Sequence, residues 1–246
     1  MKAFRFLTFL MIISSTITVA QVANQGTDSI IDGPYFAKQG NMSVEGYYLD
    51  GMKTGNWITY FGSGQIHIVE SYKLGTKNGV YLKISNRGYI EEQAEYLNDS
   101  LHGQKIKFSI GGKLKTVENY NTGSLEGKKL IYYDRGKVQE ESYYSKGLKD
   151  GNARWYNTEG NLIADFNYNA GILNGIQKTY YSNDTLRSEK VYELGVLIGS
   201  SKEYYENGIL KLEGSYKNGL KSGKWIEYND MGEMVEVSKY KKGELL

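Results

Sequence analysis

The chain has 246 residues, of which 30 are glycine, 23 are tyrosine, one is proline and none is cysteine. The lack of cysteine excludes disulfides, thiolate nucleophiles, cysteine-ligated metals and a cysteine-linked lipid anchor. Two histidines, His67 and His102, are too few for a three-histidine zinc site, and 30 Lys and Arg nearly balance 28 Asp and Glu.

Residues 1–20 have the pattern of a secretory signal peptide. Lys2 and Arg5 precede an almost wholly apolar run from Phe6 to Ile13, and small residues near Ala20 offer a cleavage site. The run is shorter than the ~20 residues that a membrane-spanning helix needs. We therefore expect export outside the cytoplasm, with no transmembrane segment left after cleavage.

The charge of the expected mature chain bears on its partners. Removing residues 1–20 takes away two cations and no acids, which leaves 28 Lys and Arg against 28 Asp and Glu. No long basic run follows, so neither nucleic acid nor an anionic lipid surface is an expected partner. Residues 21–33 read as a linker, and 34–48 read as a half repeat that caps the array.

A period of 24 residues fills positions 49–240 with eight repeats. It is marked by a tyrosine column that continues without insertion from Tyr48 to Tyr240, through Tyr72, Tyr96, Tyr120, Tyr144, Tyr168, Tyr192 and Tyr216. A glycine column has no exception: Gly55, Gly79, Gly103, Gly127, Gly151, Gly175, Gly199 and Gly223. Two further glycine columns, containing Gly51 and Gly64, bring the three to 24 of the 30 glycines. The glycine content is therefore architectural.

Each repeat is expected to form a β-hairpin. Short runs rich in Tyr, Ile, Val and Thr lie between the glycines, with strands expected at about 57–61 and 66–72. Glycines such as Gly64 suit the turn within the hairpin, and the polar segment 75–79 is expected to link one hairpin to the next. Because Ile66 and Tyr72 are separated by an even number of residues, they are expected to share the core face.

The predicted fold is all-β: a single-layer, elongated antiparallel sheet of about eight stacked 24-residue hairpins, resembling a solenoid. Such a sheet has two open edges. Lys239, Lys241 and Lys242 are expected to discourage association at one of them, with 241–246 as a short tail. At the other edge, Phe36 and Met42 match the repeat, while Gly33 takes the position of Trp57.

The segment 216–228, with Tyr216, Gly219, Gly223, Trp225 and Tyr228, resembles the MORN repeat in its bacterial variant. The resemblance covers positions 36–243, although the tryptophan is kept only at Trp57 and Trp225. It implies a bacterial protein with a hairpin array that serves interaction or assembly. Bacterial relatives are often labelled antitoxins, a role that the export signal disfavours.

No catalytic site, metal site or cofactor is predicted. His67 and His102 lack a fixed carboxylate partner, and neighbouring carboxylates in Glu91-Glu92 and Glu140-Glu141 are expected on opposite faces of the sheet. The candidate binding residues are aromatic: Tyr133, Tyr181 and Tyr205, whose neighbours Tyr132, Tyr180 and Tyr204 should point to the other face, and Trp155.

These observations predict an exported, non-catalytic protein that binds or scaffolds an unidentified protein partner. Two alternatives remain open. Exposed aromatic rows would suit a carbohydrate or cell-wall binding module, and an antitoxin-like inhibitor would also bind a protein.

Overall fold

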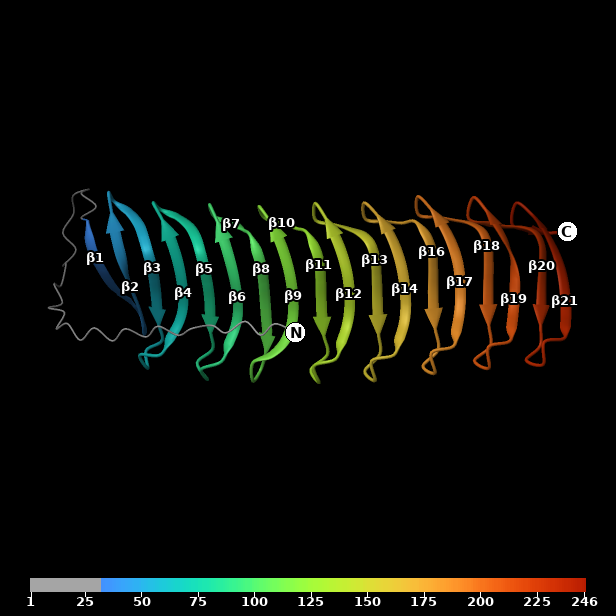
Figure 1. The fold of residues 1–246 in the computed structure, drawn as a ribbon, viewed down its shortest axis with the longest axis horizontal. Helices are drawn as coiled ribbons and strands as arrows, with labels where there is room; N and C mark the ends of the chain where they lie inside the picture. Colours follow the sequence, from blue (N-terminus) through green and yellow to red (C-terminus); the bar gives the residue numbers. More distant parts are fainter. Residues whose placement is uncertain (1–31) are drawn as a thin grey trace, which may run out of the picture.

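The computed structural model describes residues 32–246, which form one long antiparallel sheet (Figure 1). The predicted signal peptide, and the linker up to residue 31, lie outside the described residues. The strands are β1 (Gly33–Gln39), β2 (Met42–Leu49), β3 (Met52–Tyr60), β4 (Ile66–Lys73), β5 (Thr76–Ile84), β6 (Ile90–Leu97), β7 (Ser100–Leu101), β8 (Gly103–Ser109), β9 (Lys113–Asn121), β10 (Ser124–Leu125), β11 (Gly127–Tyr132), β12 (Val138–Ser145), β13 (Leu148–Tyr156), β14 (Leu162–Asn169), β15 (Ile172–Leu173), β16 (Gly175–Tyr180), β17 (Leu186–Glu193), β18 (Val196–Tyr204), β19 (Leu210–Lys217), β20 (Leu220–Tyr228), β21 (Met234–Lys241) and β22 (Glu244–Leu245).

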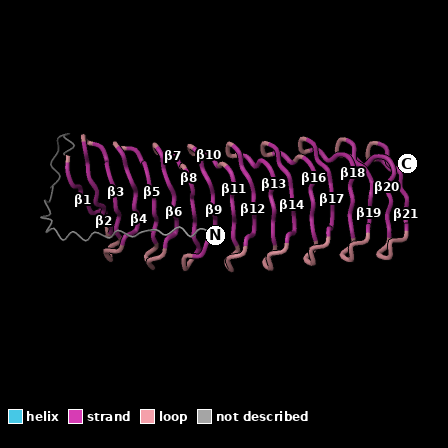
Figure 2. Tube along the Cα trace, viewed as in Figure 1, coloured by secondary structure: helices cyan, strands magenta, loops and turns pink. Residues whose placement is uncertain are grey.

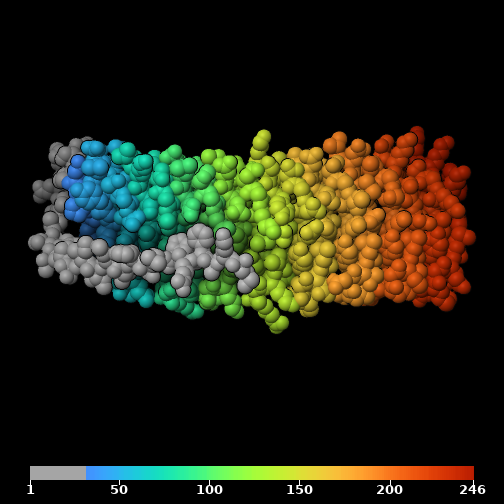
Figure 3. Space-filling view, in the orientation of Figure 1, coloured from blue at the N-terminus to red at the C-terminus, as the bar shows by residue number. Residues whose placement is uncertain are grey.

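The predicted fold is confirmed. Consecutive long strands pair antiparallel, whereas the two-residue strands β7, β10 and β15 pair with the strand before them and lead into the strand after them. β1 and β21 lie at opposite ends of an elongated single layer (Figure 1), and the space-filling view in Figure 3 shows the same elongated body. The sheet is open rather than closed into a ring, because no pairing joins these two end strands. Within residues 32–246 there is no helix long and apolar enough to cross a membrane.

The connections between strands form two rows of loops along opposite long rims of the sheet (Figure 2). At one rim, which we call the hairpin rim, Phe61 N–H donates to the Gln65 carbonyl at 2.8 Å and closes the turn of the first repeat. At the other, the linker rim, only Leu74 and Gly75 separate β4 from β5, and both have positive φ (47° and 83°). Two positive φ angles in succession are the signature of a type I′ turn, which suits the twist of paired strands.

The linker segment expected at 75–79 is therefore wrong: β5 already begins at Thr76. Gly79 lies inside that strand with a φ of 110°, next to a register shift between Glu70 and Tyr72 of β4. The glycines in the column of Gly55 and Gly79 thus lie at β-bulges inside strands and not in loops. Glycine suits these positions because other residues rarely adopt such φ values.

A second bulge corrects the expected core face. Thr59 pairs with Ile68, but the next residue, Tyr60, pairs with Ile66, so His67 is an extra residue. Directly paired residues share a face and consecutive residues alternate. Ile66 therefore lies on the face of Tyr60, opposite to the face of Ile68 and Tyr72, and the prediction that Ile66 and Tyr72 share a face is wrong.

The two broad faces can now be named. The Trp57 face carries Trp57 and Thr59 together with the tyrosine column, and the Tyr60 face carries Tyr60, Ile58 and Ile66. On the Trp57 face, Trp57 packs edge-on between Tyr48 and Tyr72, with ring centroids 5.0 and 6.3 Å away. Because the sheet is a single layer, the described hydrophobic residues that are fully buried are few: Trp57, Ala94, Ala153 and Trp225.

The first hairpin is shorter than the others, which corrects the expected match at its start. Gln39 pairs with Met42 across a two-residue turn and no bulge follows, so Tyr35 pairs with Gly46 as Trp57 pairs with Glu70. Tyr35, and not Gly33, therefore takes the position of the tryptophan. Its ring lies 5.4 Å from Tyr48 and 5.3 Å from Trp57.

Candidate functional site

Several carboxylates are held in ion pairs along the sheet. On the Trp57 face, Glu118 binds Lys129 at 2.9 Å and accepts a hydrogen bond from the Tyr120 hydroxyl at 3.0 Å. Burial raises the pKa of the Glu118 carboxyl, but the hydrogen bonds and charge of Lys129 outweigh it and the pKa is lowered. Burial and the bond to Glu118 raise the pKa of Tyr120 to about 12. Glu118 is thus a fixed anion rather than a proton donor.

The two acidic pairs behave differently from each other. Glu140 binds Lys149 and Glu141 binds Lys128, both at 2.8 Å, and these glutamates lie on opposite faces as predicted. For Glu91 and Glu92 the prediction of opposite faces is wrong. Glu91 is the extra residue of a bulge, and its carboxylate binds Lys83, which pairs directly with Glu92. Both carboxylates of that pair are neutralised by lysines, Glu92 by Lys105 at 3.0 Å.

The histidines lie apart. The His67 ring packs on Phe61 at 4.2 Å, and its Nδ1 lies 3.0 Å from the Ile84 carbonyl oxygen of the next repeat. His102 lies at the linker rim, where its backbone N–H donates to Glu95. Over residues 32–246 no cluster of three or more His, Cys, Asp or Glu side chains could hold a metal ion. The His67 ring therefore connects two repeats.

The candidate tyrosines make the same kind of connection. The hydroxyls of Tyr133, Tyr181 and Tyr205 each donate to a backbone carbonyl one repeat further on, at Tyr156 (2.8 Å), Tyr204 (2.8 Å) and Tyr228 (2.9 Å). All three side chains are half-buried at the hairpin rim. Their hydroxyls are thus occupied within the array, and a role in binding a partner stays a prediction.

Trp155, the fourth candidate, is half-buried on the Trp57 face. It packs edge-on against Phe166 at 5.4 Å, and the ammonium of Lys149 lies 4.6 Å from its ring centroid. Lys53 and Lys221 contact Trp57 and Trp225 in the same way, at 4.2 and 4.4 Å. Lysine ammonium groups over aromatic rings are therefore a repeated stabilising contact on this face.

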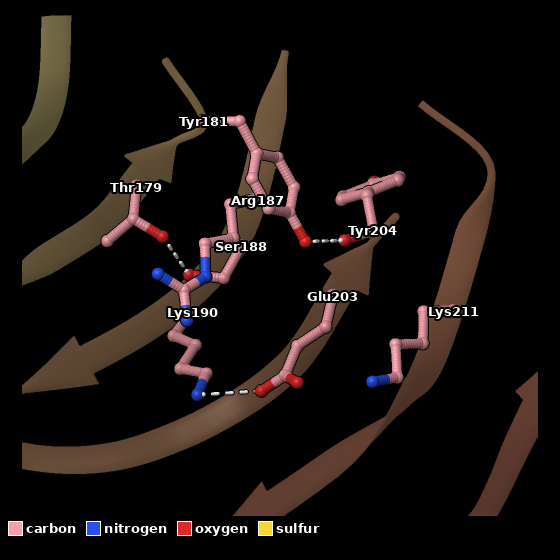
Figure 4. A pocket seen from close by; sticks show the side chains of 8 residues that line it. All are labelled: Thr179, Tyr181, Arg187, Ser188, Lys190, Glu203, Tyr204 and Lys211. Atoms are coloured by element: carbon pink, nitrogen blue, oxygen red, sulfur yellow. Dashed lines mark hydrogen bonds and ion pairs between the residues drawn. The ribbon is translucent and has the colours of Figure 1, made fainter. Parts of the chain in front are cut away.

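A shallow hollow of about 400 Å³ lies near the C-terminal end of the sheet (Figure 4). Lys190 binds Glu203 at 3.0 Å across it, and the hydroxyls of Thr179 and Ser188 are 2.6 Å apart. Arg187 and Lys211 lie beside these pairs, and neither makes an ion pair with the residues shown in Figure 4. The hollow offers positive charge, but it brings together no nucleophile and general base.

A regular exposed feature of the linker rim is a row of aliphatic side chains. Its members are the first residues of β13, β15, β18 and β20, spaced by 24 residues, and they are 44–51% exposed: Leu148, Ile172, Val196 and Leu220. Each side chain lies beside the glycine that is the second residue of the next linker turn. For Leu148 this is Gly171, where a Cβ would lie 3.6 Å from Leu148 Cδ2. We call these four residues the aliphatic rim. They form a row of exposed apolar residues, on the order of 29 Å long at ~4.8 Å per strand.

The same column in the N-terminal repeats is mostly polar, with Thr76, Ser100 and Ser124 in place of the aliphatic residues. Sequence reasoning missed the aliphatic rim, although the 24-residue spacing of its members is visible in the chain. The segment around 148–151 was expected to be a polar link between hairpins, whereas the structure places Leu148 at the start of a strand that projects it from the edge.

Three segments match the MORN repeat variant family: residues 125–146, 173–193 and 197–218. They lie in the C-terminal half, and each follows the 24-residue period described above. The match is to a repeat family, and no enzyme family was identified. No curated protein matches the chain significantly.

Proposed function

Because the chain is a MORN-variant repeat protein, we propose that it is an exported, non-catalytic scaffold that binds another protein along its aliphatic rim. The observation that supports this proposal is the four-residue apolar edge, exposed over three successive repeat steps. Apolar patches that persist on a folded surface mark interaction sites, because burying them against a partner removes apolar area from water.

The chemistry of the rim favours a protein over a carbohydrate. Leu148, Ile172, Val196 and Leu220 carry branched aliphatic groups, which fit apolar side chains of a partner. Sugar rings stack on exposed aromatic faces, and the tyrosines proposed for that purpose are half-buried with bonded hydroxyls. Export is supported by the signal-like pattern of residues 1–20.

The chain supplies a matched control for testing the rim. In the double variant Ile172→Lys/Val196→Lys, two ammonium groups replace the centre of the apolar edge. In Ser100→Lys/Ser124→Lys, the same changes fall in the same column, three repeats earlier. Ile172, Val196 and Ser124 are exposed, and Ser100 is half-buried at a strand end. Substitutions at exposed sites change stability by about 0.5 kcal/mol or less, so both variants should fold.

The measurement is affinity capture from an envelope extract, followed by direct binding of the captured protein. We expect the partner to be retained by the wild type and by Ser100→Lys/Ser124→Lys, and lost by Ile172→Lys/Val196→Lys. Equal retention by all three proteins, or retention of glycans with no protein, would contradict the proposed site.

A further inference from the structure

The two ends of the sheet are open edges. Among the described residues, β1 pairs with β2 alone, and β21 pairs with β20 along its length but with β22 only at Tyr240 and Lys241. The Leu246 N–H adds one bond to the Lys239 carbonyl. The stretch of β21 from Met234 to Ser238 therefore has no strand on its outer side within residues 32–246.

Both edges expose apolar side chains. Phe36 on β1 is 52% exposed, and Met234, Val235 and Val237 on β21 are 49–64% exposed. Lys239, Lys241 and Lys242, expected to protect this edge, lie at the end that β22 and Leu246 already cover. The open part of the edge carries one charged side chain, Glu236, so the predicted protection falls on the wrong end of the strand.

The two edge strands, β21 and β1, correspond to two strands that are neighbours inside the sheet. Inside the sheet, the strand that follows β4 is β5, in which Tyr81, Leu82 and Lys83 pair back with Glu70, Val69 and Ile68. β21 has the position of β4 in its repeat, with Val237 in the column of Val69. β1 has the position of β5, because Tyr35 pairs with Gly46 as Tyr81 pairs with Ala94.

We propose that a second copy of this chain docks its β1 on β21, so that the sheet continues from one molecule into the next. The partner's Tyr35 would pair with Ser238, the partner's Phe36 with Val237, and the partner's Ala37 with Glu236. On the Tyr60 face this creates the row Ile226, Val237 and the partner's Phe36, which repeats the interior row Ile58, Val69 and Leu82. On the Trp57 face it places the partner's Tyr35 beside Tyr240.

Pro34, the one proline, fits this register. The partner's Pro34 would take the position of Val80, which lies at the bulge and pairs with no residue of the preceding strand β4. Its missing N–H therefore costs no cross-strand bond. The partner's Gly33, with a φ of 132°, would take the position of Gly79, with a φ of 110°.

The direction of the strands also permits the contact. β7, β10 and β15 each continue as the next strand in the same sheet position, and β22 is a two-residue segment, so the 22 strands occupy 18 full positions. An even number of alternating strands makes β1 antiparallel to β21, and a copy shifted along the sheet presents β1 in the required direction. Such a head-to-tail contact does not close, so it builds open-ended chains of molecules.

The test uses two variants that each block one edge, Phe36→Lys on β1 and Val237→Lys on β21, with Ile110→Lys as a control in an exposed turn far from both edges. Circular dichroism checks that all three fold. Sedimentation velocity of the purified protein then follows the average mass up to roughly 1 mM, where even a weak contact is populated. Wild type and Ile110→Lys should grow beyond a dimer as concentration rises, and each edge variant alone should stay a monomer.

Mixing the two edge variants decides the geometry. Val237→Lys keeps an intact β1 and Phe36→Lys keeps an intact β21, so a 1:1 mixture should form a dimer and stop there. Self-association of either edge variant alone would mean that like edges pair, and would overturn the proposal. A wild type that stays monomeric throughout, or a mixture that stays monomeric, would overturn it as well. The result is independent of the aliphatic rim, which lies on a different edge.

Discussion

The indole of Trp57 lies directly over the backbone of Gly46 on the preceding strand: a Cβ at position 46 would be 2.3 Å from Trp57 Cδ2. Trp225 has the same relationship to Gly214, at 2.2 Å. In both pairs the glycine precedes the tryptophan by 11 residues. Neither glycine has positive φ. These two positions therefore require glycine because the indole leaves no space for a Cβ, and not because of backbone conformation.

We predict that Gly46→Ala destabilises the N-terminal repeats, because the added methyl group overlaps the indole. Overpacking of this kind costs about 1–3 kcal/mol, measured as a lower midpoint of denaturant unfolding followed by tryptophan fluorescence. Ser238→Ala changes the same column at the sheet edge and should have little effect. The cost of Gly46→Ala should shrink in a Trp57→Ala background, and an equal cost in both backgrounds would show that the indole is not the cause.

The repeat columns could be predicted from the sequence, but the bulges that decide which face each residue occupies could not. The 24-residue columns predicted strands, repeats and the single layer, because periodic tyrosines and glycines can be satisfied by one hairpin repeated without insertion. The bulge at His67 left no such mark, since one extra residue changes the face of Ile66 while the spacing of the columns stays the same. The shorter first hairpin likewise moves Tyr35 into the place that the spacing assigned to Gly33.

The candidate sites were harder to predict for a related reason. Aromatic residues at turns could be counted from the sequence, but the hydrogen bond from Tyr181 to the next repeat depends on where the neighbouring carbonyl lies. The aliphatic rim depends in turn on a linker of two residues instead of five, which turns Leu148 from a loop residue into an edge residue of β13.

We predict that Tyr181→Phe lowers stability by about 1 kcal/mol, because the Tyr204 carbonyl loses its donor while the ring is kept. The check is urea unfolding compared with Tyr143→Phe, whose hydroxyl makes only a long bond of 3.3 Å to Glu141 on an exposed part of the sheet. If Tyr181→Phe leaves unfolding unchanged and weakens capture of the partner, the tyrosine belongs to a binding surface instead.

Stability should fall at high pH through Tyr60. Burial, together with the hydrogen bond to Glu45, raises the pKa of Tyr60 from 10.0 to about 12. The folded state therefore holds this proton more tightly than the unfolded state, so its contribution is complete below about pH 10 and is lost as the pH rises toward 12. Unfolding midpoints measured across this interval should fall less in Tyr60→Phe than in the wild type, and parallel curves would contradict the assignment to Tyr60.

We also predict that the ion pair of Glu118 and Lys129 can be replaced by a glycine and a tryptophan, as at Gly46 and Trp57. Lys129 lies in the column of Trp57, and its partner Glu118 precedes it by the same 11 residues, with side chains only 21% and 13% exposed. Lys129→Trp alone would press an indole against the Glu118 side chain and leave that carboxylate unpaired. Glu118→Gly alone would leave the half-buried Lys129 ammonium without its anion, and each single change should cost about 1–3 kcal/mol.

The double variant Glu118→Gly/Lys129→Trp removes both charges and restores the arrangement of Gly46 and Trp57, with Tyr120 and Tyr144 as the flanking rings. Replacing a partly buried ion pair by well-packed apolar groups is often neutral or stabilising, so the double variant should be at least as stable as the wild type. A thermodynamic cycle of the four proteins by denaturant unfolding measures the coupling between the two positions, expected at about 2 kcal/mol. Additive losses would mean that the 11-residue relationship is a coincidence of two repeats and not a packing rule of the sheet.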